Sequence, residues 1–269
     1  MFRHLSAVWT ARHFLLALVK LDLRLRYKRS VLGIGWSLAH PIAMTVVFTV
    51  VFSQLFGDGD PVGYAAFALA GLAVWGFLRD AATHGSRAFL TNEGYIRQSP
   101  MPYTIYTLRT VLGQAIHACM ALSVVVALLV VWKGDAGVFV GVALALPGLL
   151  LALVAAWAVA TIGAFLTAFF QDVAHILEVA AQIGFFLTPI MYRRSVLDDR
   201  GLGWLVDINP ASLYLSLIRD PLLLAGIPTV AQLGQLGQLY LSALAVTAVL
   251  VALAAGVVSW LNKKVIFHL

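Results

Sequence analysis

The sequence has few charged residues for its length and a large excess of apolar ones. Asp, Glu, Lys and Arg together make up 11% of its 269 residues, whereas an average soluble domain carries about 25%. Hydrophobic residues make up 61%, and the mean hydropathy is +0.92. A soluble fold of this length has too few polar side chains to cover so much apolar surface. The composition therefore excludes a soluble domain and predicts an integral membrane protein.

Two further absences narrow the chemistry that the chain can perform. Cys119 is the single cysteine, which excludes an intrachain disulfide and a metal site built from cysteines. No phosphate loop of the form G-x-x-x-x-G-K-[ST] occurs, so we expect any ATP to be bound by another chain. The formal net charge of +6 is attributed to cations at the cytoplasmic ends of membrane spans, and no nucleic acid partner is expected.

Apolar stretches that are long enough to cross a bilayer, about 20 residues, recur six times. The expected spans are residues 31–56, 62–82, 104–132, 138–170, 176–192 and 236–261. With both termini in the cytoplasm, the inner segments hold 13 lysines and arginines and the outer loops hold five, as the positive-inside rule requires. The sequence therefore predicts an all-α integral membrane protein, a single domain over 1–269 with six transmembrane helices.

Residues 1–30 are expected to form an N-terminal interfacial helix. At helical spacing, Leu18, Leu21 and Leu25 share one face, and the basic residues Lys20, Arg24 and Lys28 share another. This pattern is typical of a helix that lies in the membrane interface with its cations toward lipid phosphates. A cytosolic arm that only sets the topology is the alternative.

Residues 193–235 are too apolar for an ordinary loop and too interrupted by proline for a further span. Residues 202–206 and 211–225 are expected to be two short helices, separated by Asn209-Pro210. Backbone that re-enters the membrane is tolerated where protein or a water-filled cavity surrounds it. We therefore expect a re-entrant helical hairpin that acts as an outer gate before the last span; an amphipathic surface hairpin is the alternative.

Other functional classes receive little support from the sequence. Asp172, His175 and Glu178 share one helical face, but a di-metal bundle needs a second matching set, so we interpret them as a helix-end cluster and expect no metal site. The carboxylates and histidines do not cluster as a catalytic site requires, and no enzyme activity is expected. An ion-coupled carrier usually has internal repeats, and we find none between the two halves of the chain.

Three ordered stretches carry a resemblance to a known family. They are residues 25–33 with Trp36 and Pro41, residues 91–102, and residues 170–173 with 187–192 and Asn209-Pro210. In this order and spacing they resemble the permease subunits of polysaccharide and O-antigen ABC exporters, which are ABC-2 type permeases. The similarity extends over essentially the whole chain.

The resemblance implies that residues 83–103 form a cytoplasmic coupling region that docks into a separate ATPase. Its central residues are Asn92, Glu93, Gly94, Tyr95, Ile96 and Arg97. On the residues alone, Glu93 and Arg97 are four apart and can pair, and Tyr95 and Ile96 offer apolar anchors. A plain cytoplasmic loop is the alternative.

The resemblance also implies roles for a cationic cluster and for a set of aromatic residues. The cations, expected to hold a lipid diphosphate or ordinary anionic lipid headgroups, are Arg24, Arg26, Lys28 and Arg29. The aromatic residues, expected to line a glycan channel, are Trp36, Phe48, Phe52, Phe185, Phe186 and Tyr192. Taken singly, each ring is equally compatible with helix packing or with a lipid-facing position.

The resemblance implies a homodimeric permease that works with two ATP-binding cassette subunits in the plasma (inner) membrane. It would export a lipid-linked polysaccharide such as O-antigen, capsule or a teichoic-acid-like glycan. ATP and magnesium would bind on the partner subunits, so this chain would carry no cofactor of its own. An ABC-2 permease for a drug or small lipid and an ATP-independent secondary carrier are the alternatives.

Overall fold

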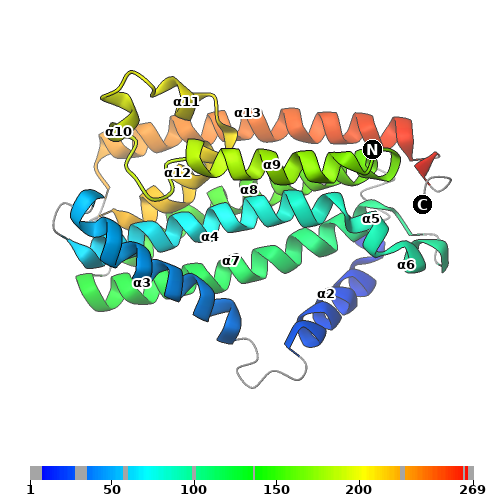
Figure 1. Cartoon of the computed structure of the whole chain (residues 1–269), viewed down its shortest axis with the longest axis horizontal. Helices are drawn as coiled ribbons and strands as arrows, with labels where there is room; N and C mark the ends of the chain where they lie inside the picture. The colour runs from blue at the N-terminus through cyan, green and yellow to red at the C-terminus, as the bar shows by residue number, and fades with distance from the viewer. Residues whose placement is uncertain are drawn as a thin grey trace.

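The computed structural model describes residues 8–27, 35–56, 60–98, 101–135, 137–224, 228–262 and 264–265, with backbone alone for residues 26, 27, 37, 48 and 52–56. This part of the chain consists of helices and turns and contains no strand. The helices, drawn in Figure 1, are α2 (Arg12–Tyr27), α3 (Trp36–Phe56), α4 (Pro61–Ser86), α5 (Ala88–Thr91), α6 (Glu93–Gln98), α7 (Thr104–Lys133), α8 (Gly137–Phe169), α9 (Asp172–Leu187), α10 (Ser195–Asp198), α11 (Trp204–Asp207), α12 (Pro210–Leu223) and α13 (Val230–Leu261).

Local sequence signals start and stop the long helices. Asp60 caps α4 by accepting a hydrogen bond from the Gly63 amide at 2.9 Å, and Pro61 occupies the first turn, where a missing N–H costs nothing. Thr229 and Gln232 form a capping box at the start of α13. Gly134, at φ 62°, ends α7 in the left-handed conformation that glycine adopts most easily.

Four described helices, α4, α7, α8 and α13, are long and apolar enough to cross a membrane. They cover four of the six expected spans, which confirms a multi-pass helical membrane protein, but α4 ends at Ser86 and α13 begins at Val230, beyond the expected limits of 82 and 236. The helix expected at 176–192 differs at its end: α9 stops at Leu187. Thr188 precedes Pro189 and is extended at φ −97° and ψ 131°, because a proline ring disfavours helical backbone in the residue before it. At 16 residues, α9 is about 24 Å long.

Small side chains bring the central helices close together. Helix α4 lies between α3, α7 and α8, and α8 also packs against α12 and α13 (Figure 1). A Cβ added at Gly85 of α4 would lie 2.5 Å from the Ala160 Cβ of α8, and one added at Gly71 would lie 2.6 Å from the Ile190 carbonyl oxygen. Such close approach is how membrane helices gain van der Waals contact in a solvent that is as apolar as they are.

Helix α2 runs obliquely across α7 (Figure 1). Its buried face, which includes Leu15 and Val19, packs against Ile105 at the start of α7. Leu21 and Leu25, which the sequence placed on the apolar face, are exposed at 38% and 55%. The protein therefore covers one part of that apolar face and leaves the other part open.

The end of the molecule opposite α5 and α6 holds α10, α11 and α12 (Figure 1). Helices α11 and α12 correspond to the two short helices expected in this segment, whereas α10 was not expected. Arg194 lies 2.7 Å from Asp207, and that hydrogen bond raises the pKa of the guanidinium. The short helices of this end are thus held together by charge-assisted contacts on the surface.

Helix α12 is tied at two points to the segment that follows α9. The Asn209 side-chain amide donates to the Thr188 hydroxyl at 2.8 Å, and the buried Arg219 donates to the Pro189 carbonyl at 2.6 Å. The Tyr64 hydroxyl of α4 donates to the Met191 carbonyl at 3.0 Å. These bonds, which join α4, the end of α9 and α12, predict that the three elements move together.

Candidate functional site

The expected coupling region is a pair of short helices, α5 and α6, between the long helices α4 and α7 at one end of the bundle (Figure 1). An aromatic cluster anchors it to the bundle. Phe89 is fully buried and meets the Phe165 ring edge-on at 4.9 Å. Ile96 of α6 is buried in the same cluster, with Tyr106. The coupling region is therefore seated on α7 and α8 and is not a free loop.

One face of α6 remains open. The Glu93 carboxylate lies 2.7 Å from Nε of Arg97, as their spacing of four residues predicts. Gly94, Tyr95 and Arg97 are exposed, Tyr95 at 42%. Ile96, expected as an apolar anchor for a partner, points into the protomer instead. Tyr95 is thus the large, partly apolar side chain that is exposed on this face.

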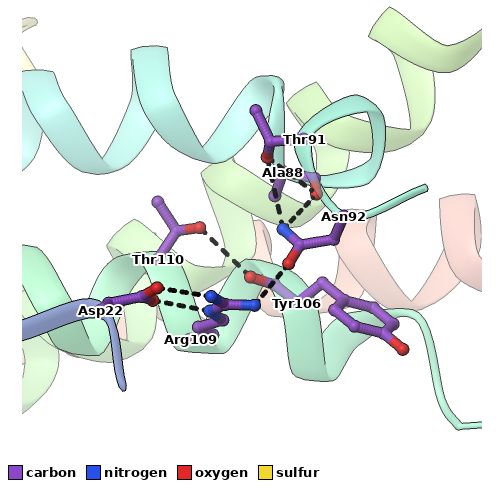
Figure 2. A network of polar contacts seen from close by, with 7 residues as sticks. All are labelled: Asp22, Ala88, Thr91, Asn92, Tyr106, Arg109 and Thr110. Atoms are coloured by element: carbon purple, nitrogen blue, oxygen red, sulfur yellow. Dashed lines mark hydrogen bonds and ion pairs between the residues drawn. The ribbon is translucent and has the colours of Figure 1, made fainter. Parts of the chain in front are cut away.

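Asn92 plays an internal part, shown in Figure 2. It is 6% exposed, and its side-chain nitrogen donates to the Ala88 carbonyl at 2.7 Å. Its side-chain oxygen accepts from Nη1 of Arg109 at 2.6 Å. Asn92 therefore fixes the turn between α5 and α6 and attaches that turn to α7.

Arg109 connects three elements through one guanidinium group (Figure 2). Its Nε donates to Oδ2 of Asp22 on α2 at 2.6 Å, and its Nη2 bonds the other carboxylate oxygen. Its side chain is 11% exposed, and the Tyr95 ring lies 5.6 Å from its central carbon. We call Asp22, Asn92 and Arg109 the Arg109 node. The planar fork of arginine suits it to hold a carboxylate and an amide at the same time.

The sequence analysis missed Asp22 and Arg109 as site residues. Two signals were available: Asp22 is the one acid in a basic helix, and Arg109 is a cation inside the third expected span. Ionisable groups in such positions usually have a specific partner. Their pairing joins residues that are 87 positions apart, which local spacing does not reveal.

The cations expected to hold a lipid headgroup are only partly described. Arg24 lies on α2 and is exposed, as is Lys20 one turn before it. Arg26 belongs to α2 by its backbone. Lys28 and Arg29 lie outside the described residues. Their role in binding lipid diphosphate stays a prediction.

The expected channel aromatics occupy different environments. Trp36, at the start of α3, is 58% exposed, and together with Phe185 of α9 it lines a cavity of about 590 Å³ between α3, α4 and α7. Phe186 is 74% exposed, and Tyr192 donates a hydrogen bond to its carbonyl at 2.8 Å. The side chains of Phe48 and Phe52 on α3 lie outside the described part of the chain. Channel lining by these rings stays a prediction.

In the helix-end cluster at the start of α9, Glu178 forms an ion pair with Arg87 and has His175 as a neighbour. Glu178 lies 2.8 Å from Arg87 and 3.5 Å from His175. Among the residues that the structure describes, no three His, Cys, Asp or Glu side chains gather closely enough to hold a metal ion.

These features define a multi-pass membrane protein with an open polar helix at one end, attached to the bundle by a charged node. The chain belongs to the ABC-2 type transporter family, which it matches over residues 13–223, and this confirms the family resemblance. Members of this family are the membrane subunits of transporters in which a partner hydrolyses ATP.

Two curated relatives are similar over most of their length. The chain is 25% identical over 205 residues to the O-antigen export system permease protein RfbA of Klebsiella pneumoniae, covering 75% of this chain and 77% of that protein. It is 23% identical over 214 residues to the O-antigen export system permease protein RfbA of Myxococcus xanthus, covering 78% and 80%.

Proposed function

We propose that this chain is the permease subunit of an ABC exporter that moves a lipid-linked polysaccharide out of the cytoplasm. Family membership and the names of the two relatives support the substrate class. The observation that carries the mechanism is the open face of α6, tied through Arg109 to both α2 and α7. ATP and magnesium bind on the partner subunit.

In this mechanism, closure of the ATP-binding subunits pushes on α6. The Arg109 node passes that displacement to α2 and to the start of α7. Helix α4 is continuous with α5 through Arg87 and carries the displacement toward α3 and the far end of the bundle. There α4 is bonded to the segment after α9, so the inner push reaches α12.

The proposed topology has six spans with both termini in the cytoplasm, in the plasma (inner) membrane. Helices α3 and α9 supply the two spans beyond the four long ones. Both expose large apolar side chains along their length, including Val46 and Val50 on α3 and Ile176 and Ile183 on α9. We assign these faces to the contact between two copies of the chain and to lipid.

Helix α12 is proposed as the re-entrant gate element. Leu217 packs on Gly148 of α8, which lies 11 residues, about 16 Å, from the start of that helix. Lys133, at the end of α7, donates to the Leu223 and Leu224 carbonyls at the other end of α12. Helix α12 therefore runs from inside the bundle to its outer edge.

The test is transport by the reconstituted complex. Proteoliposomes with this chain and its ATP-binding partner should translocate lipid-linked glycan when ATP is supplied, and vesicles with this chain alone should not. Reversing the charges with Glu93→Lys and Arg97→Glu should reduce transport strongly, although this surface pair itself stabilises α6 by only about 0.3–0.5 kcal/mol. ATP-independent transport by the chain alone would overturn the proposal.

A further inference from the structure

The cavity between α3, α4 and α7 has a polar end and an apolar end. The polar end, toward α5 and α6, includes Arg79, Asp80 and Gln114. The apolar end, about two turns away along α4 and α7, is formed by Leu72, Ala73, Ala118 and Ala121. Its volume of about 590 Å³ lies in the range of small-ligand sites. The cavity therefore suits a short amphipathic segment of a ligand and is too small for a polymer.

The charges at the polar end balance each other. Arg79 donates from Nε to Oδ1 of Asp80 at 2.7 Å, and its Nη2 lies at the same distance from that oxygen. Half of the Arg79 side chain and a quarter of the Asp80 side chain stay exposed. The pair thus presents both donors and an acceptor without a surplus of positive charge. His40 and His117 also line the cavity, and an imidazole N–H can donate a hydrogen bond to a phosphate oxygen of the link between a sugar and a lipid.

Aromatic rings line the same cavity as this ion pair. Trp36 is largely exposed, and Trp75 is buried with its ring meeting Phe185 at 6.2 Å and 66°. All three residues line the cavity. Rigid rings next to a few fixed polar groups are the usual construction of a site for a ligand with both apolar and hydrogen-bonding faces, and a sugar ring is such a ligand.

We propose that this cavity binds the lipid-proximal end of a lipid-linked glycan within one protomer. The first sugar hydrogen-bonds to the Arg79–Asp80 pair and Gln114, the phosphate linkage lies beside His40 and His117, and the first carbons of the lipid occupy the apolar end. The inference rests on the proposed function for its substrate class. It adds a recognition site within one protomer that shares Trp36 and Phe185 with the expected channel aromatics and is separate from the cations of α2.

Two glycines offer a matched pair of variants. Gly76 lines the cavity, and a Cβ added there meets nothing within 4 Å. Gly76→Leu therefore adds its Cβ in open space and extends a side chain from the cavity wall. Gly113 on α7 also has open space around an added Cβ but is not a lining residue, so Gly113→Leu is the control. Both changes replace glycine within a helix, which favours the helix.

The experiment measures cysteine protection and ATPase stimulation on the complex with the ATP-binding partner in nanodiscs. Met44→Cys, in a Cys119→Ala background, places a thiol in the cavity wall. Three probes are compared. The first is the lipid-linked glycan purified from cells that carry this chain, and the other two are the lipid phosphate and the free glycan that mild acid releases from that purified material. The intact fraction should slow maleimide labelling at least tenfold more than either half alone, and Asp80→Asn should abolish this protection.

The second readout is the increase in ATP hydrolysis that the intact lipid-linked glycan causes, measured relative to the basal rate of each variant. This increase should be lost in Gly76→Leu and kept in Gly113→Leu. Equal protection by lipid phosphate alone, or full stimulation of Gly76→Leu, would overturn the cavity assignment while the exporter function stands. If the unmodified complex shows no stimulation by any fraction, the proposed function fails together with the assignment.

Discussion

Replacing Arg109 with lysine tests whether the Arg109 node transmits movement from the partner. Lysine keeps the positive charge but presents one ammonium group, so it cannot hold Asp22 and Asn92 as the guanidinium fork does. The arginine makes two bonds to Asp22 and one to Asn92. Losing one bond to a charged group costs about 1.5–3 kcal/mol, and each 1.4 kcal/mol is about tenfold in an equilibrium.

We therefore expect Arg109→Lys to lower the glycan transported per ATP hydrolysed by about tenfold or more. Assembly with the partner should persist, because the substitution changes no residue of α6 and keeps a cation beneath the Tyr95 ring. The assay measures transport and ATP hydrolysis on the same proteoliposomes. A double-mutant cycle with Asp22→Asn should show strong non-additivity, because both changes break the same contact.

Arg87→Lys provides the matched control at the same end of the bundle. Arg87 pairs with Glu178 at 2.8 Å, and both side chains are 40% exposed. Surface pairs of this kind contribute little, so transport per ATP should stay within about threefold of the unmodified protein. If Arg109→Lys behaves like Arg87→Lys, the node is only a structural contact, and the reasoning about transmission is wrong.

Three further predictions concern the packing and the open face. Gly85→Val places side-chain atoms against Ala160 and should lower the free energy of unfolding by about 1–3 kcal/mol. The control Gly256→Val has open space around its Cβ and should not lower it, so equal stability of the two variants would contradict the close α4–α8 packing. Arg219→Met leaves the Pro189 carbonyl without its hydrogen-bond donor and should lower the free energy of unfolding by about 1–3 kcal/mol. The control is Arg200→Met at an exposed position, and equal melting temperatures of the two variants would refute the role of Arg219 in joining α12 to the end of α9. Tyr95→Ala should weaken binding of the ATP-binding partner by about thirtyfold, the loss of an interface hot spot of 2 kcal/mol or more, without lowering thermal stability; unchanged affinity would remove Tyr95 from the docking face.

Sequence patterns predicted the helical elements well because hydrophobic length and helix signals are local. The ends of α7 and α8 agree with the expected spans within one residue. The Lys133-Gly134-Asp135 turn between the two helices marks this boundary in the sequence. The end of α9 was placed too late because its apolar run continues past Leu187. The Thr188-Pro189 dipeptide stops the helix there although the hydropathy does not change.

The functional residues were predicted less completely, because their roles depend on tertiary contacts. The Glu93–Arg97 pair followed from helical spacing and is present. Spacing did not reveal that Ile96 and Asn92 point inward, since only the position of α7 and α8 decides which side of α6 is covered. Asp22 and Arg109 become partners only when α2 crosses α7.

Site-specific cross-linking from α6 tests the central claim most directly. A photo-reactive group placed at Tyr95 should cross-link to the ATP-binding subunit in membranes, and one placed at Ile208, which is 68% exposed at the opposite end of the bundle, should not. Cross-links to that subunit from Ile208, or none from Tyr95 in an assembled complex, would contradict the account of α6 as the element that receives the partner's movement.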